Sequence, residues 1–333
     1  MNFNDILQDL KKRNYQPIYF LMGEESYFID VITDYIAQHV LQESEKAFNQ
    51  TILYGKDTDI ATIINTSKRF PMMSEYQVVI VKEAQMLNNI DDLIYYAESP
   101  LKSTILVINY KYKSLDKRKR LYKVLQDKGV IFSSDKLYDD KVPGWISSYL
   151  APKNITIDLK AAVLITEFLG NDLSKISNEL EKLIITLPEN SNNITADQIE
   201  KNIGISKDYN NFELHKALSQ KNVLKANRII NYFDKNQKSN PISVTISSLY
   251  YYFSKVLTYH FTKDKSRKNL ASALRVNPFF IPEYELAARN YSAAKVVQII
   301  SLLREYDLKS KGFGDASSSP GGLLKELIYK ILH

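Results

Sequence analysis

The sequence predicts a protein of the α/β plus all-α class, with one α/β domain followed by helical domains. Two patterns indicate this. Over roughly the first 140 residues, short and continuously apolar runs alternate with stretches of helical length, which is typical of a parallel sheet covered on both faces. After Pro143 the runs of strand length disappear, and apolar residues recur at helical spacing instead. A chain of 333 residues has room for two or three domains.

Five apolar runs are predicted strands. The first run ends at Gly23 and leads into a helix predicted from Tyr27 to Val40. Most of the later runs are also separated by stretches of helical length, so the strands are expected to be parallel. In order along the chain, the runs are PIYFLMG, FNQTILYG, QVVIV, TILVINY and GVIFSS.

The part of the chain after Pro143 is predicted to be helical. Its first long apolar-periodic stretch is interrupted near Gly170-Asn171-Asp172, which predicts two helices. Thr195 is the expected N-cap of a short helix, and the helical pattern resumes at Asn211. Two later helix faces are predicted to be apolar: Ile246, Leu249, Tyr250, Phe253, Val256 and Leu257, and then Leu323, Leu324, Leu327, Ile328 and Ile331. We therefore expect domains at 1–141, 142–208 and 209–333.

The composition excludes several classes of site. The chain has no cysteine, which rules out disulfides, thiolate metal sites and cysteine nucleophiles and favours the cytoplasm. No apolar run approaches the roughly 18 residues of a membrane span, so no membrane partner is expected. The four histidines lie far apart in sequence, and neither an H-E-x-x-H nor a G-x-S-x-G motif occurs. No metal site is predicted.

Positive charge is concentrated in one segment. Residues 111–128, which we call the basic segment, hold eight Lys and Arg against two Asp, an excess equal to the net charge of +6 of the whole chain. A polyanion could be attracted here, with Lys117, Arg118, Lys119 and Arg120 as the candidate contacts. The alternative is that these residues form a solvated helix face.

The strand that ends at Gly23 lies where a nucleotide-binding P-loop would begin, but the motif is degenerate. A P-loop has the pattern G-x-x-x-x-G-K-[ST], whose backbone N–H groups and lysine hold phosphates. Counted from Gly23, the second glycine is replaced by Phe28, the lysine by Ile29 and the magnesium-binding hydroxyl by Asp30. An aspartate beside a triphosphate would also repel it.

The third predicted strand has lost a second part of the same site. In nucleotide hydrolases of this layout, an aspartate at the strand end holds magnesium and a nearby glutamate positions water. Here Lys82 stands at the aspartate position, followed by Glu83. Because two independent parts are lost, we expect a non-enzyme that keeps the body of an ATPase and binds no cofactor. A working nucleotide enzyme is the alternative.

These motifs resemble the delta subunit of bacterial DNA polymerase III, a clamp-loader subunit. The resemblance covers nearly the whole chain and rests on the order of several stretches: PIYFLMGEESYFID, RFPMMSEYQVVIVKEA, GNDLSKISNELEKL, NNFELHKALSQKNVLKANRII, LRVNPFFIPEYELAARNYS and LLREYDLKSKG. It implies a degenerate AAA+ module, made of a P-loop-like α/β domain at 1–141 and a small helical lid at 142–208. A helical collar for oligomerisation would follow at 209–333.

The resemblance also assigns a contact site. Members of the family carry an apolar pair, typically Leu-Phe, after a proline or small residue and before the third strand, and the pair enters a pocket of the sliding clamp. Here Met72 and Met73 follow Pro71, a departure from the usual pair. Methionine is flexible and fills irregular apolar pockets. The alternative is that both methionines pack into the chain's own core, where Phe70 is expected.

The function implied is a subunit that does not hydrolyse ATP and that binds and opens the sliding clamp during chromosomal replication. Its expected partners are the clamp, the other loader subunits of tau/gamma and delta-prime type through the collar, and primer–template DNA within the assembled loader. A DNA-binding protein that uses the basic segment is the alternative. The stretch LASALRVNPFFIPEYELAARN resembles a helix-turn-helix, but Glu283 and Glu285 open its second helix where DNA readers present basic or amide side chains.

Overall fold

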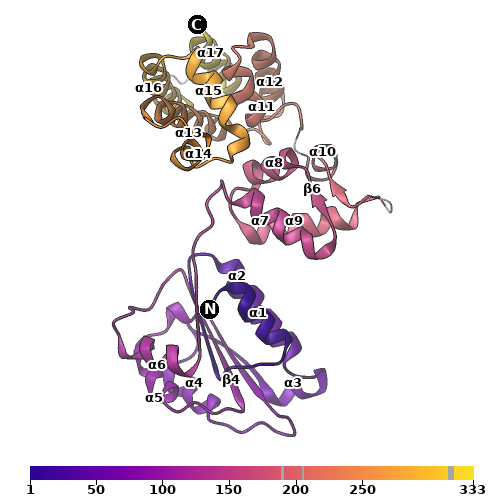
Figure 1. Cartoon of the computed structure of the whole chain (residues 1–333), viewed down its shortest axis with the longest axis vertical. Coiled ribbons are helices and arrows are strands. Elements are labelled where there is room, and N and C mark those ends of the chain that lie inside the picture. The colour runs from indigo at the N-terminus through magenta and orange to yellow at the C-terminus, as the bar shows by residue number, and fades with distance from the viewer. Residues whose placement is uncertain (189–190, 205, 314–318) are drawn as a thin grey trace. The chain divides into compact units, whose positions relative to one another are not determined.

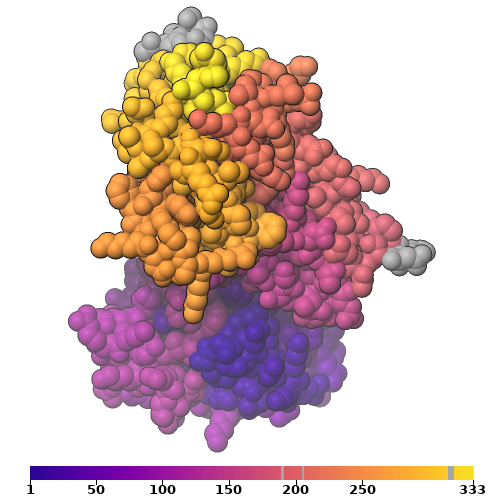
Figure 2. Space-filling model, turned by 45° about the horizontal axis from the view of Figure 1, so that its top comes forward, coloured from indigo at the N-terminus to yellow at the C-terminus, as the bar shows by residue number. Residues whose placement is uncertain are grey.

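The computed structural model describes residues 1–188, 191–204, 206–313 and 319–333. The chain divides into two compact units, 1–137 and 138–333, which are drawn as ribbons in Figure 1 and as space-filling atoms in Figure 2. The first division falls close to the predicted end of the α/β domain at 141. The predicted division of the remainder at 208 stays a prediction.

The first unit is built on a parallel sheet whose strands have the predicted positions. The strands are β1 (Ile18–Gly23), β2 (Gln50–Tyr54), β3 (Gln77–Lys82), β4 (Thr104–Lys111) and β5 (Val130–Ser134). Their order across the sheet is β2-β3-β4-β1-β5, and every neighbouring pair is parallel. The strand that ends at Gly23 is therefore interior, and β2 forms one edge.

Helices cover both faces of this sheet, as Figure 1 shows. On one face α1 (Phe3–Lys11) and α2 (Ser26–His39) bury apolar side chains against one alternate set of strand residues. On the other face α4 (Ile60–Ser67), α5 (Ile94–Ala97) and α6 (Arg120–Lys128) do the same. Because successive strand residues point to opposite faces, continuously apolar strands supply both layers. The remaining elements are α3 (Glu43–Asn49) and the 3₁₀ turns η1 (Ala84–Met86) and η2 (Ile90–Leu93).

The second unit begins with helices broken where the sequence predicts. Its first elements are α7 (Val142–Leu150), η3 (Ala151–Lys153), β6 (Thr156–Ile157), α8 (Leu159–Leu169), α9 (Leu173–Ile185), β7 (Asn193–Ile194) and α10 (Ala196–Ile203). Gly170 ends α8 with a φ of +69°, and Asp172 caps α9 by accepting from the backbone N–H of Lys175. Thr195 caps α10 as predicted.

One expectation for this region is wrong. The sequence predicts no strand after Pro143, but β6 and β7 form a short parallel pair. Each strand has only two residues, so neither produces an apolar run or an alternation that a periodicity argument can detect.

The remaining helices share one apolar core. They are α11 (Asn211–Ser219), α12 (Val223–Lys235), α13 (Ile242–Phe261), α14 (Arg267–Leu274), α15 (Ile281–Asn290), α16 (Ala293–Ser310) and α17 (Pro320–Leu332), with the 3₁₀ turn η4 (Pro278–Phe280) before α15. All five predicted residues of α17 are buried. On α13, Tyr250 is exposed and Tyr252 is buried in its place, because Tyr252 stacks on His215 of α11 and packs beside Tyr284 of α15. Among the helices of the described residues, none combines the length and apolar character that crossing a membrane requires.

A buried carboxylate joins three helices of the second unit. Glu213 of α11 forms ion pairs with Lys160 of α8, at 2.9 Å, and with Lys225 of α12. Burial by itself would raise the pKa of Glu213, but the hydrogen bonds from Lys225 and Lys160 outweigh burial and hold the pKa below its ordinary value. The charged form is therefore stabilised in the folded protein.

We expect Glu213→Gln to lower the free energy of unfolding by roughly 2 kcal/mol at neutral pH, because hydrogen bonds to charged groups contribute about that much. The lowered pKa sets the sign of the pH dependence. The contribution is present above the ordinary glutamate pKa of about 4.3 and is lost as the pH falls through the folded-state value, so the difference from wild type should shrink in acid. Urea denaturation followed by the fluorescence of Trp145, the single tryptophan, measures it in the second unit.

Glu305→Gln is the matched control, because Glu305 pairs with Lys309 on the surface of α16. An exposed pair of this kind contributes less than about 1 kcal/mol. Equal effects of the two substitutions would contradict a special role for Glu213.

Candidate functional site

The loop of residues 68–76, between α4 and β3, exposes three large apolar side chains. Met72 is 62% exposed, Phe70 is 76% exposed and Met73 is fully exposed. The methionines are therefore not part of the chain's own core. The expectation that Phe70 is buried is wrong, because its position in this surface loop leaves the ring exposed. We call Phe70, Met72 and Met73 the apolar cluster.

Two buried carboxamides hold this loop, and the sequence gives no sign of either role. Gln77, the first residue of β3, donates from Nε2 to the carbonyl of Arg69 at 2.6 Å and to Oγ1 of Thr104 at 2.9 Å. Asn49, the last residue of α3, accepts from the backbone N–H of Met72 at 2.6 Å and donates to its carbonyl at 3.0 Å. The Met72 backbone is thus held on both sides.

The next residue has an unusual backbone conformation. Met73 has a φ of +53°, a left-handed conformation that is uncommon for residues other than glycine. Clustered apolar side chains on the surface of a protein mark a contact with another molecule more often than singly scattered ones do. The geometry therefore supports docking of the apolar cluster into an apolar pocket.

The connection between β1 and α2, where a P-loop would lie, is too short for a phosphate-binding loop. β1 ends at Gly23 and α2 begins at Ser26, so only two residues connect them. Phe28, Ile29 and Asp30 all lie inside α2, where Ile29 is completely buried and the ring of Phe28 lies 4.8 Å from that of Phe3. These positions are part of the helix and its packing.

The N-terminus of α2 is already capped by a side chain of the protein. The carboxylate of Glu25, a buried residue, accepts a hydrogen bond from the backbone N–H of Tyr27 at 3.1 Å. The free N–H groups at a helix N-terminus are what bind phosphate in a P-loop. A carboxylate in the same place occupies a donor and repels a second anion.

The packing of the strands explains why residue 23 is a glycine, without any role in nucleotide binding. Its φ is +120°, and a Cβ atom built on it would lie 2.1 Å from the carbonyl oxygen of Ser134 in β5. The backbone of Glu24 also donates to that oxygen, at 2.9 Å. Glycine is therefore required for the close approach of β1 and β5.

The ends of β3 and β4 hold a group of opposite charges. Lys111, the last residue of β4, places its Nζ at 2.6 Å and 2.8 Å from the two carboxylate oxygens of Asp30. Burial raises the pKa of Asp34, and the nearby carboxylate of Asp30 raises it further. The positive charges of Lys82 and Lys111 oppose this rise. Lys82 thus lies near the carboxylates of α2, at the end of β3 where a metal-binding aspartate is absent. Glu83 follows it in a left-handed conformation.

The basic segment is largely neutralised by carboxylates. Of the four candidate contacts, Arg118 pairs with Asp116 at 2.7 Å, Lys119 with Asp91 at 2.5 Å and Arg120 with Glu98 at 2.6 Å. Two of these acids lie outside the segment, so the local excess of charge is smaller than the sequence indicates. Only Lys117 among the four forms no ion pair with a residue that the structure describes.

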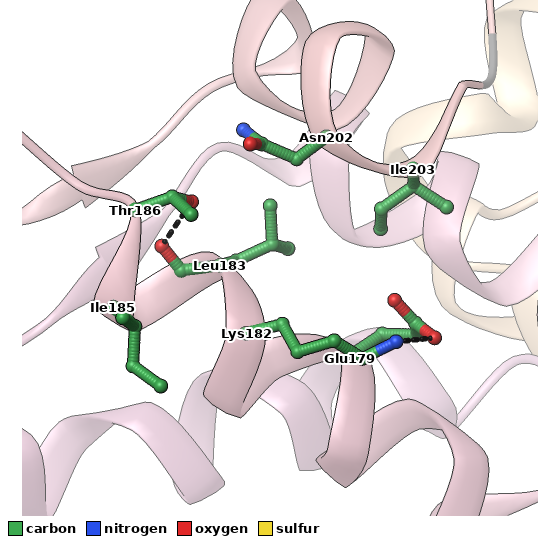
Figure 3. Close-up of a pocket in the computed structure, with 7 residues that line it drawn as sticks. All are labelled: Glu179, Lys182, Leu183, Ile185, Thr186, Asn202 and Ile203. Atoms are coloured by element: carbon green, nitrogen blue, oxygen red, sulfur yellow. Dashed lines mark hydrogen bonds and ion pairs between the residues drawn. The ribbon is translucent and has the colours of Figure 1, made fainter.

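A shallow groove of about 330 Å³ lies in the second unit, between α9 and α10 (Figure 3). Leu183 and Ile203 face it, and Glu179 forms an ion pair with Lys182 at 2.5 Å along one side. Within the described ranges, no three His, Asp or Glu side chains are grouped so that they could hold a metal ion. The groove is polar at its rim and contains no pair of groups arranged for catalysis.

Comparisons with known proteins agree with the resemblance. Residues 19–135 match the family model of the DNA polymerase III delta subunit. The curated DNA polymerase III subunit delta of Bacillus subtilis (strain 168) is 26% identical over 318 residues, which are 92% of this chain and 91% of that protein. The solved structure of the Bacillus subtilis DNA clamp loader delta protein covers 99% of both chains with a TM-score of 0.61 at 24% identity. The predicted fold class, α/β plus all-α, is confirmed by the parallel sheet of the first unit and the helices of the second, and the similarity in structure shows the same fold.

We expect Gly23→Ala to destabilise the first unit by about 2 kcal/mol or more, because it forces a side chain into a glycine-only conformation and against Ser134. Thermal unfolding followed by circular dichroism measures the effect. Gly144→Ala is the control, since a Cβ there meets no atom within 4 Å. Unchanged stability of the Gly23 variant would show that this position tolerates a side chain and that strand packing does not require glycine there.

Proposed function

We propose that the chain, which is similar in sequence and fold to the DNA polymerase III delta subunit, binds and opens the DNA sliding clamp as a clamp-loader subunit. The similarity to the delta subunit supports a role in the clamp loader of the replication machinery. The opening step and its site are our proposal. The observation that supports them is the apolar cluster, exposed on a loop whose backbone is held at Arg69 and Met72.

Met72 and Met73, which follow Pro71, form the proposed contact with an apolar pocket of the clamp. Burying two such side chains contributes roughly 3 to 5 kcal/mol before ordering costs. Phe70 is exposed on the same loop. Binding shifts the clamp toward an open form only if the contact is stronger with the open form than with the closed one.

The proposed subunit does not hydrolyse ATP and is not a polymerase. Three features of the site support this: the carboxylate of Glu25 at the N-terminus of α2, the Asp30–Lys111 ion pair, and Lys82 at the end of β3. Each places a charge of the wrong sign, or one already neutralised, where phosphate or metal would bind. Energy for the loading cycle would then come from neighbouring subunits.

The proposed partners are the sliding clamp and the other loader subunits. Contacts with subunits of tau/gamma and delta-prime type would involve the helical region 209–333, whose own core is complete. Primer–template DNA would contact the chain weakly inside the assembled loader, since ion pairs reduce the field of the basic segment. Replication of the chromosome implies a cytoplasmic location.

We expect no saturable binding of ATP at micromolar concentrations, because the α2 N-terminus is capped by Glu25 and no phosphate-binding loop precedes it. Equilibrium dialysis of the purified chain against labelled ATP measures this directly. Saturable micromolar binding would overturn the proposal that the nucleotide site is lost.

We expect the double variant Met72→Ser/Met73→Ser to bind the clamp of the same organism at least about 100-fold more weakly than wild type, equivalent to about 2.7 kcal/mol. Surface plasmon resonance on immobilised clamp measures the affinity, and circular dichroism should be unchanged because both side chains are exposed. Met86→Ser, at another exposed methionine of the first unit, is the control and should bind normally. Full binding by the double variant would show that the contact with the clamp lies elsewhere on the chain.

A further inference from the structure

Asn49 lies outside the apolar cluster, but its side chain is hydrogen-bonded to the backbone of Met72. The residue is buried at the end of α3, and 23 positions of sequence separate it from Met72. Its Oδ1 accepts from the N–H of Met72 at 2.6 Å, and its Nδ2 donates to the carbonyl of Met72 at 3.0 Å. One side chain thus satisfies both backbone groups of one residue.

The orientation of this carboxamide is determined by its surroundings. Nδ2 also donates to the carbonyl of Glu45 at 3.2 Å, so it faces two acceptors while Oδ1 faces a donor. A flipped amide would place its oxygen against two carbonyl oxygens. The position therefore calls for a side chain that presents an acceptor to the Met72 N–H and a donor to the two carbonyl groups.

The segment between Arg69 and Met72 is held at both ends. Gln77 hydrogen-bonds the carbonyl of Arg69, and Asn49 hydrogen-bonds Met72. Pro71 lies between them, which restricts its own φ and the conformation of the residue before it. The backbone that carries Phe70 and Met72 therefore has few free torsions.

We propose that Asn49 is a positioning residue for clamp binding, whose carboxamide presents the methionines in the conformation that binds. The inference rests on the proposed function of the loop. A mobile loop would lose backbone freedom when its side chains enter a pocket, and a loop that is already ordered loses less. Asn49 thus contributes to affinity without touching the clamp.

Asn49→Ala in the full-length chain tests this. We expect clamp affinity to fall about tenfold in surface plasmon resonance, and exchange of the Met72 backbone amide to become faster in hydrogen-exchange measurements. Exchange in the interior of β3 should be unchanged, which separates a local effect on the loop from general destabilisation. Asn65→Ala, at an exposed asparagine of α4 before the loop, is the control and should change neither quantity.

Asn49→Asp is the second variant, since it keeps the size and the acceptor for the Met72 N–H and removes the donor. It remains informative where the alanine variant does not fold, and the same loss of affinity is expected from it. Wild-type affinity in a variant whose Met72 amide exchanges faster would overturn the proposal, because loop order would then not matter. In the alanine variant, which removes the acceptor of the Met72 N–H, lost affinity with unchanged Met72 exchange would overturn it as well. No binding by the wild type itself would instead refute the proposed function.

Discussion

The close approach of β1 and β5 at Gly23 determines what the first unit can do. The backbone of this residue lies so near the Ser134 carbonyl that only glycine fits, and the chain then enters α2 after two residues. A phosphate-binding loop needs a longer connection with free N–H groups. Here Glu25 caps the helix itself. The glycine that looks like the remnant of a nucleotide site is thus part of the packing of the sheet.

The proposed contact lies at the end of the sheet opposite to the usual ligand-binding end. In parallel α/β sheets, ligands usually bind at the carboxyl ends of the strands. In this chain that edge is occupied by its own charges, among them Lys82 and the Asp30–Lys111 pair. The apolar cluster lies before the first residue of β3, at the opposite edge, where the buried carboxamides of Asn49 and Gln77 hold it. The sheet would thus serve as a support for the proposed protein contact.

The second unit shows the same use of buried polar groups to order apolar elements. The helices from α11 to α17 share one core, but apolar contacts are non-directional. The carboxylate of Glu213, bonded to Lys160 and Lys225, joins α8 to α11 and α12 with directional contacts. Breaking a buried ion pair destabilises more strongly than making one stabilises, so this junction favours one arrangement of these helices.

The sequence by itself determined the features that depend on neighbouring residues: the five strands, the break at Gly170, the cap at Thr195 and the missing P-loop residues. Each is encoded in local periodicity or in motif spacing. Only the tertiary structure decided the exposure of Phe70, the burial of Tyr252 instead of Tyr250, and the pairing of the basic segment. The Asn49–Met72 contact belongs to the same group. These depend on partners from distant segments, which folding brings together and which no local pattern records.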